Sequence, residues 1–160
     1  MNSRPTTVED ALRLVRVDLD PHHRQPSALM VLVATVASLV GSLAADAALV
    51  AIGTTVFPST KGFVHFHFSD YAKLTVIGVV GACIAWPIVT RISSAPRWLY
   101  LRLAVLVTLV LLVPDAWILL HGEPAKAVAV LMTMHLAIAV VTYNCMVRIA
   151  RVGEPHLAEV

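Results

Sequence analysis

The sequence predicts an all-α protein, a four-helix transmembrane bundle that crosses the bilayer up-down-up-down. The chain of 160 residues is 58% hydrophobic and only 14% charged, whereas a soluble domain carries about 25% charged residues. Its apolar residues also gather into four runs, each long enough for the roughly 20 residues that a helix needs to cross a bilayer. The four runs cover residues 28–52, 71–92, 98–120 and 125–147.

These runs divide the chain into three parts. Residues 1–27 form a mostly polar N-terminal segment, residues 28–150 form the membrane domain, and residues 151–160 form a short tail. The parts outside the membrane domain are too small to build a second globular domain.

Positive charge is divided unevenly between the two ends of the runs. The nine arginines precede the first run, flank the link between the second and third, or follow the fourth. The three lysines, Lys61, Lys73 and Lys126, fall at the opposite ends. Because cytoplasmic loops retain an excess of Lys and Arg, this asymmetry predicts that both termini are cytoplasmic.

The segment before the first run has an amphipathic pattern over residues 7–19. Thr7 can cap a helix whose first turn holds Glu9. Apolar residues then recur at helical spacing, at Val8, Leu12, Val15 and Leu19. The pattern predicts a short helix. Two interpretations stay open, a helix that lies in the membrane interface or docks on a partner, and a solvated helix with a weak apolar stripe.

The longest connection, residues 53–70, is rich in aromatic residues and histidines. Alternation along it would place Val64, Phe66 and Phe68 on one side and His65 and His67 on the other. We expect this segment to lie in the outer interface, either extended or as a turn of helix.

The other two connections are short, so consecutive spans are expected to pack as antiparallel neighbours. Small residues at four-residue spacing predict surfaces where another helix approaches closely. These helix-packing residues are Ala37, Gly41 and Ala45 in the first span and Gly78 and Ala82 in the second.

A few polar residues interrupt the spans and form a predicted intramembrane polar cluster. Its members are Ser42 and Asp46 in the first span, Thr108 and Asp115 in the third, and His135 in the fourth. Ionisable side chains at membrane depth usually face the bundle interior or water. Three interpretations stay open: hydrogen bonds that hold the helices together, a proton- or cation-responsive site, and a metal or cofactor site. Imidazole suits a proton-responsive site because it titrates near neutral pH.

Histidines on the outer side suggest where a metal would bind. His65, His67 and His121 are expected there, together with Asp70 and Glu123. Imidazole and carboxylate suit zinc or a similar divalent ion, although His-x-His is a weak motif. The prediction is that no cofactor is needed, with a divalent metal as the alternative.

The sequence offers no recognisable enzyme chemistry. It contains no His-Glu-x-x-His, nucleophile elbow or Gly-rich phosphate loop. Its two cysteines, Cys83 and Cys145, lie inside spans without Cys-x-x-Cys spacing. The basic residues lie at membrane borders, where orientation explains them, so no nucleic-acid partner is expected.

The stretch from Pro124 to Leu136, which ends in Met-His-Leu, and the Pro96-Arg97-Trp98 approach to the third span carry a family resemblance. They resemble a family of small four-span actinobacterial membrane proteins of unknown function, in which a Met-His-Leu triplet marks the last span. The resemblance covers residues 28–150. It implies a four-helix bundle in a bacterial plasma membrane and points to His135, but it supplies no activity.

Together these patterns predict a non-catalytic accessory or scaffold protein that assembles with itself or with a larger membrane complex. Small size, short loops and the surface of Ala37, Gly41 and Ala45 favour this function. One alternative is a small proton- or cation-linked transporter or sensor that uses the intramembrane Asp and His residues. The other is an outer-face metal-binding membrane protein.

Overall fold

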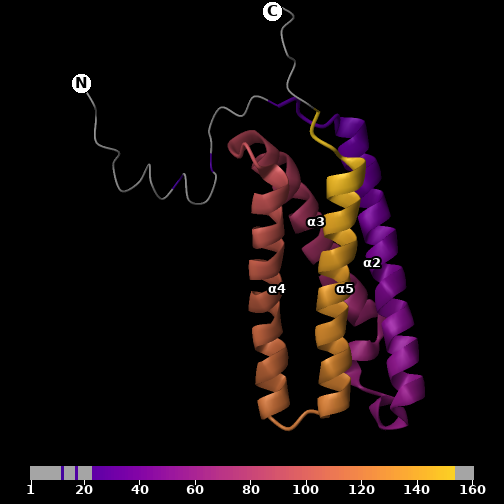
Figure 1. Ribbon diagram of the computed structural model, residues 1–160. Helices are drawn as coiled ribbons and strands as arrows, with labels where there is room; N and C mark the ends of the chain where they lie inside the picture. The colour runs from indigo at the N-terminus through magenta and orange to yellow at the C-terminus, as the bar shows by residue number, and fades with distance from the viewer. Residues whose placement is uncertain (1–11, 13–16, 18–22, 154–160) are drawn as a thin grey trace, which may run out of the picture.

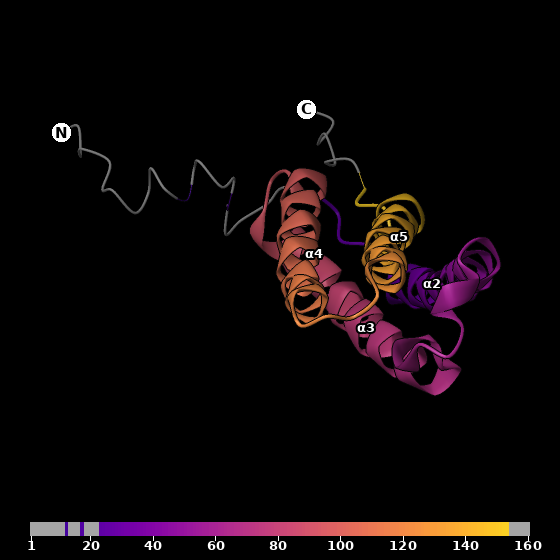
Figure 2. The same ribbon diagram turned by 90° about the horizontal axis from the view of Figure 1, so that it is seen from below.

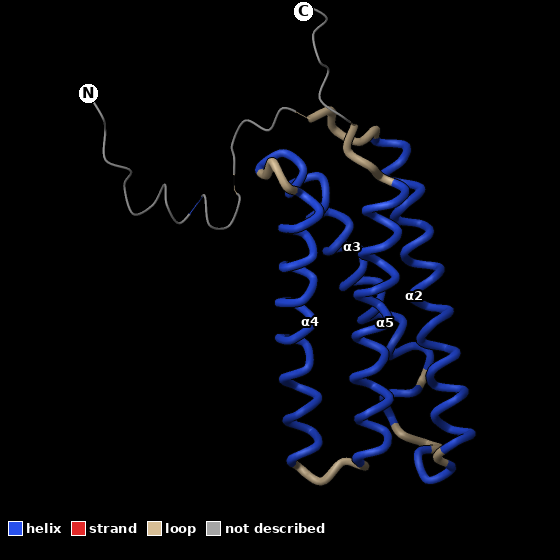
Figure 3. The backbone as a smooth tube through the Cα atoms, viewed as in Figure 1, coloured by secondary structure: helices blue, strands red, loops and turns tan. Residues whose placement is uncertain are grey.

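The computed structural model describes residues 12, 17 and 23–153 as a bundle of four long helices (Figure 1). They are α2 (Ala28–Val56), α3 (Phe68–Ile92), α4 (Pro96–Leu120) and α5 (Ala125–Ile149). Each of the four is long and apolar enough to cross a membrane. The described residues contain helices and connections but no strand (Figure 3). The predicted fold class is confirmed, and the helices begin and end within about one turn of the predicted runs.

Local sequence explains where the helices start. Ser27 caps α2 by accepting a hydrogen bond from the Met30 backbone N–H at 3.3 Å. Pro96 occupies the first turn of α4, where its missing N–H costs nothing. Within each span the chain stays helical because a helix satisfies its own backbone hydrogen bonds, whereas lipid offers the backbone no hydrogen-bond partners.

The bundle has two distinct ends (Figure 1). Residues 23–27, the turn between α3 and α4, and residues 150–153 lie at one end, which we call the termini end. Residues 57–67 and the turn between α4 and α5 lie at the other, the loop end. Viewed along the bundle, α3 is inclined to the other helices (Figure 2). It leans from α2 at the loop end toward α4 at the termini end.

The larger apolar core lies at the termini end. Trp86 is its largest fully buried side chain, and Val79, Cys83, Tyr100 and Met146 surround it. The Trp86 and Tyr100 rings pack edge to face with centroids 5.1 Å apart. A smaller apolar cluster of Tyr71, Val130 and Met134 lies toward the loop end.

The chain on either side of the bundle is tied to its termini end. His23 Nε2 lies 2.7 Å from the Thr90 carbonyl oxygen, to which the Gln25 side-chain amide also donates at 2.9 Å. The Thr90 hydroxyl donates back to Gln25 Oε1 at 2.7 Å. Gly153 N–H donates to the Arg24 carbonyl at 2.9 Å. The last turn of α3 therefore finds partners for a carbonyl that the helix itself leaves free.

The aromatic connection differs from the predicted alternation. It forms two short 3₁₀ helices, Pro58–Thr60 and Val64–Phe66. Phe63 is buried, with its ring against His65 and Phe66, whereas Val64 and Phe68 are exposed. The predicted alternation was wrong because a 3₁₀ turn repeats every three residues rather than every two, whereas the alternative of a turn of helix is found at Val64–Phe66.

The predicted helix over residues 7–19 lies outside the described residues, apart from Leu12 and Val17. The same holds for the tail beyond residue 153. The predicted orientation, with both termini cytoplasmic, stays a prediction.

Candidate functional site: the intramembrane polar cluster

The polar residues of α2 lie on one buried face. Ser38, Ser42 and Asp46 recur every four residues, and all three are fully buried. The Ser38 hydroxyl donates to the Ala34 carbonyl at 2.7 Å, but the Ser42 hydroxyl has no hydrogen-bond partner. This face therefore brings an unpartnered hydroxyl and a carboxylate into the bundle interior.

Asp46 accepts one hydrogen bond from α3. The Thr75 hydroxyl donates to Asp46 Oδ2 at 2.6 Å, a distance typical of hydrogen bonds to a charged acceptor. The other oxygen, Oδ1, is buried without a partner. Because burial of an unpartnered carboxylate oxygen is costly, a proton or a cation at Oδ1 would stabilise the site.

Asp115 of α4 and His135 of α5 meet across their helices. His135 Nδ1 lies 3.1 Å from Asp115 Oδ2 and 3.1 Å from the Leu131 carbonyl oxygen. Only the contact with the carbonyl has hydrogen-bond geometry, so Asp115 Oδ2 is buried without a hydrogen bond. The contact with Asp115 becomes an ion pair only when His135 carries a second proton.

Titratable side chains of all four helices lie within electrostatic reach of one another. His135 interacts with Asp46 as well as with Asp115. Asp115 also interacts with His65 of the 57–67 connection, and Tyr71 of α3 interacts with Asp46. A series of titratable groups therefore leads from the loop end into the bundle.

Two buried threonines add to this interior. The Thr108 hydroxyl donates to the Ala104 carbonyl at 2.7 Å, so its hydrogen bond goes to its own helix rather than to Asp115. Thr142 lies on α5 about two turns from His135, and its hydroxyl has no partner. Buried oxygen atoms without a hydrogen bond thus come from α2, α4 and α5. Of these only Asp115 Oδ2 has another contact, with His135, and the rest call for an explanation in a folded protein.

The predicted helix-packing residues differ in what they contact. A Cβ atom added at Gly41 would lie 2.9 Å from Val141 Cγ1 of α5, so this small-residue surface packs against another helix of the same chain. Ala37 and Ala45 beside it are half-buried. Gly78 of α3 is exposed with nothing near its missing Cβ, and Ala82 accepts a hydrogen bond from the Tyr100 hydroxyl at its carbonyl.

The outer histidines do not come together in a metal-binding group. The His121 ring packs on Trp117, with centroids 4.3 Å apart, and the His65 ring packs on Phe63. His67 is exposed. Within residues 23–153, no three His, Cys, Asp or Glu side chains are arranged to hold a metal ion. The metal hypothesis therefore gains no support from their placement.

Sequence reasoning missed Thr75, the donor to Asp46. Its signal was present but weak: Tyr71, Thr75, Val79 and Cys83 recur every four residues and are all buried. In an apolar span this spacing identifies a face, but it does not tell which neighbouring helix that face meets.

The fold and this interior define a helical membrane protein with four candidate spans and buried ionisable groups at membrane depth. The model of a family of unknown function (DUF6069) matches residues 20–152, and the chain belongs to that family. No curated protein and no solved structure is significantly similar to the chain.

Proposed function

We propose that this chain is a non-catalytic, proton-responsive protein of a bacterial plasma membrane, a small transporter or sensor that works through its intramembrane polar cluster. One observation carries the proposal. Asp46 is fully buried in the bundle, yet one of its carboxylate oxygens has no partner.

The chemistry of the cluster supports this function over hydrogen bonding alone. A buried side chain with a purely structural role satisfies its polar atoms, as Ser38 and Thr108 do through carbonyls of their own helices. Asp46 and Asp115 instead each keep a buried oxygen that accepts no hydrogen bond. Protonation or cation binding would satisfy these atoms, so their occupancy would depend on conditions outside the protein.

Several groups face this site and take part in any response to pH. On the outer side these are Asp115 of α4 and His65 of the 57–67 connection. His135 of α5, deeper in the bundle, and Tyr71 of α3, at the loop end, lie within electrostatic reach of Asp46. Imidazole is the group among them that ordinarily titrates near neutral pH.

The test is the pH dependence of thermal stability for purified protein in mild detergent. Linkage makes the melting temperature follow the protons that folded and unfolded states bind. We expect a change of about 3 °C between pH 5 and pH 8, which corresponds to about 1 kcal/mol in a chain of this size. Asp46→Asn and His135→Ala should each flatten that dependence. Glu123→Gln is the matched control because Glu123 is exposed in the turn between α4 and α5.

A second measurement separates a transporter from a sensor. Protein is reconstituted into liposomes that enclose a pH-sensitive dye, and a pH gradient is imposed. A transporter admits protons faster than empty liposomes do, and Asp46→Asn removes the difference. A sensor gives no flux but keeps the pH-dependent melting. Melting temperatures that show no pH dependence, or the same dependence in the Asp46 and His135 variants, would refute both versions.

An accessory or scaffold function is the second candidate, and an open surface on α3 favours it. Gly78 and Gly81 are exposed, and no atom lies within 4 Å of the Cβ positions they lack. A helix of a second copy or of a larger complex could approach closely there. Gly78→Leu should then reduce the size of the assembly in mild detergent, and an unchanged size would reject this surface.

A further inference from the structure

We propose that the cleft between α4 and α5 binds an anionic phospholipid, with its phosphate among three arginines at the termini end and one acyl chain along the two helices. This site is separate from the intramembrane polar cluster and does not depend on the function proposed for it.

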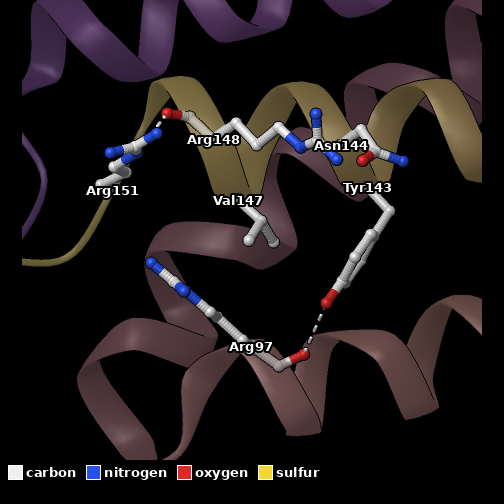
Figure 4. A pocket seen from close by; sticks show the side chains of 6 residues that line it. All are labelled: Arg97, Tyr143, Asn144, Val147, Arg148 and Arg151. Atoms are coloured by element: carbon white, nitrogen blue, oxygen red, sulfur yellow. Dashed lines mark hydrogen bonds between the residues drawn. The ribbon is translucent and has the colours of Figure 1, made fainter.

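The headgroup part is a pocket of about 430 Å³ at the termini end. Arg97 of α4, Arg148 at the end of α5 and Arg151 just beyond it line the pocket, together with Tyr143, Asn144 and Val147. Figure 4 shows Arg97 extending from α4 toward the end of α5, where Arg151 lies. The pocket wall is held by two hydrogen bonds, from the Tyr143 hydroxyl to the Arg97 carbonyl at 3.5 Å and from Arg151 Nε to the Arg148 carbonyl at 2.8 Å.

The charge of this pocket suits a phosphate. Among the described residues, no carboxylate forms an ion pair with Arg97, Arg148 or Arg151. The positive end of the α4 dipole and the negative end of the α5 dipole both lie at this pocket, so the three guanidinium groups set its charge. Arginine also binds phosphate oxygens in pairs through its planar guanidinium group.

The acyl-chain part is an apolar groove of about 230 Å³ between the same two helices. It runs from Tyr143 and Asn144 toward the loop end along side chains such as Leu101, Val105, Leu136 and Val140. Several of these side chains are exposed in the chain alone, which places them against lipid in a membrane.

The pocket and the groove meet at shared residues. Tyr143 and Asn144 line both, so the phosphate pocket and the apolar groove adjoin at these two residues. A cationic pocket beside an apolar groove matches a molecule with a phosphate at one end and hydrocarbon at the other. A soluble phosphate would use only the pocket, so the groove favours a lipid.

Native mass spectrometry of the full chain in detergent tests this inference. The protein is incubated with phosphatidylglycerol, with phosphatidylcholine, or with phosphatidylglycerol plus excess inorganic phosphate. We expect phosphatidylglycerol to be retained about tenfold more than phosphatidylcholine, with little displacement by phosphate.

The variants locate the site. Arg97→Gln combined with Arg148→Gln should reduce retention of phosphatidylglycerol about tenfold. Arg91→Gln is the control because Arg91 is exposed at the same end of the bundle but does not line the pocket. Ala139→Leu narrows the groove and should weaken lipid binding without any change of charge. It also keeps the inference testable if the double variant loses its helical circular dichroism.

Three results would overturn the inference. Equal retention of the two lipids would exclude recognition of net negative charge. Complete displacement by inorganic phosphate would point to a soluble anion as the ligand. An equal loss in the Arg91→Gln protein would show that general surface charge, rather than this pocket, holds the lipid.

Discussion

At the termini end of the bundle the two large buried side chains that carry a polar group, Trp86 and Tyr100, both have hydrogen-bond partners, whereas toward the loop end the buried Asp46 keeps a carboxylate oxygen without one. Trp86 Nε1 donates to the Ala150 carbonyl at 2.8 Å, and the Tyr100 hydroxyl donates to the Ala82 carbonyl at 3.0 Å. Nearer the loop end, Asp46 Oδ1 has no partner, and Asp115 Oδ2 has only the contact with His135 Nδ1 at 3.1 Å.

The two ends therefore have different roles: the termini end holds the packing that stabilises the bundle, and the interior toward the loop end holds the ionisable groups. Helices in lipid gain little from the hydrophobic effect against one another, so packing and interhelical hydrogen bonds hold them together. The termini end concentrates both of these in its aromatic core. The interior toward the loop end contains ionisable groups, and the function proposed above depends on them. Four substitutions test this division, in order of expected effect.

Trp86→Ala should cause the largest loss of stability. It removes the largest fully buried side chain and leaves the Ala150 carbonyl without its donor. Large-to-small substitutions of buried aromatic residues cost about 3–5 kcal/mol. The free energy of unfolding in mixed detergent measures the loss. Trp86→Phe keeps an aromatic ring but removes the indole N–H, so it separates the contributions of the two to stability. A loss below about 1 kcal/mol would mean that the termini end is not the stable part.

Gly41→Leu should destabilise the chain by about 1–3 kcal/mol through overpacking. Even the first added carbon would lie 2.9 Å from Val141 Cγ1, so either the Val141 side chain would have to move or α2 and α5 would have to separate. Gly78→Leu is the matched control for stability, because its side chain would enter open space. If the two variants melt alike, α2 and α5 do not approach each other as closely as described.

Gln25→Ala should cost about 1 kcal/mol at the termini end. It removes two hydrogen bonds with Thr90, one to its carbonyl and one from its hydroxyl, while His23 keeps a contact with that carbonyl. A net contribution of about 0.5–1.5 kcal/mol is usual for each such bond, and the total stays near the lower end because the Thr90 hydroxyl keeps a hydrogen bond to the Pro87 carbonyl. Hydrogen exchange of the last turn of α3 should rise in this variant, and unchanged exchange would show that the segment before α2 does not hold that turn.

Thr75→Val should have the smallest effect on stability, about 0.6 kcal/mol, the average for interhelical hydrogen bonds in a membrane bundle. It removes the donor to Asp46 Oδ2 with little change in shape. Its effect on pH dependence should be larger than its effect on stability, because Asp46 would lose its one hydrogen bond from a side chain. Melting curves at several pH values measure both, and a wild-type pH profile would contradict the role given to Asp46.

Much of the fold followed from the sequence because lipid imposes strict rules on it. The four spans followed from run length alone, and the buried faces followed from spacing: Ser42 and Asp46 on α2, and Thr108 and Asp115 on α4, all point into the bundle. The 57–67 connection was less predictable because turn geometry there depends on the burial of Phe63.

The chain by itself thus determined its four helices and which of their residues face inward, since both depend on local apolar length and helical period. Only the tertiary structure decided which faces meet: Asp115 with His135, Asp46 with Thr75, and Gly41 with Val141. The physical reason is that lipid is as apolar as the bundle interior. Hydropathy therefore cannot tell which helices pack together. The tertiary structure also inclines α3, so that its two ends lie against different neighbouring helices.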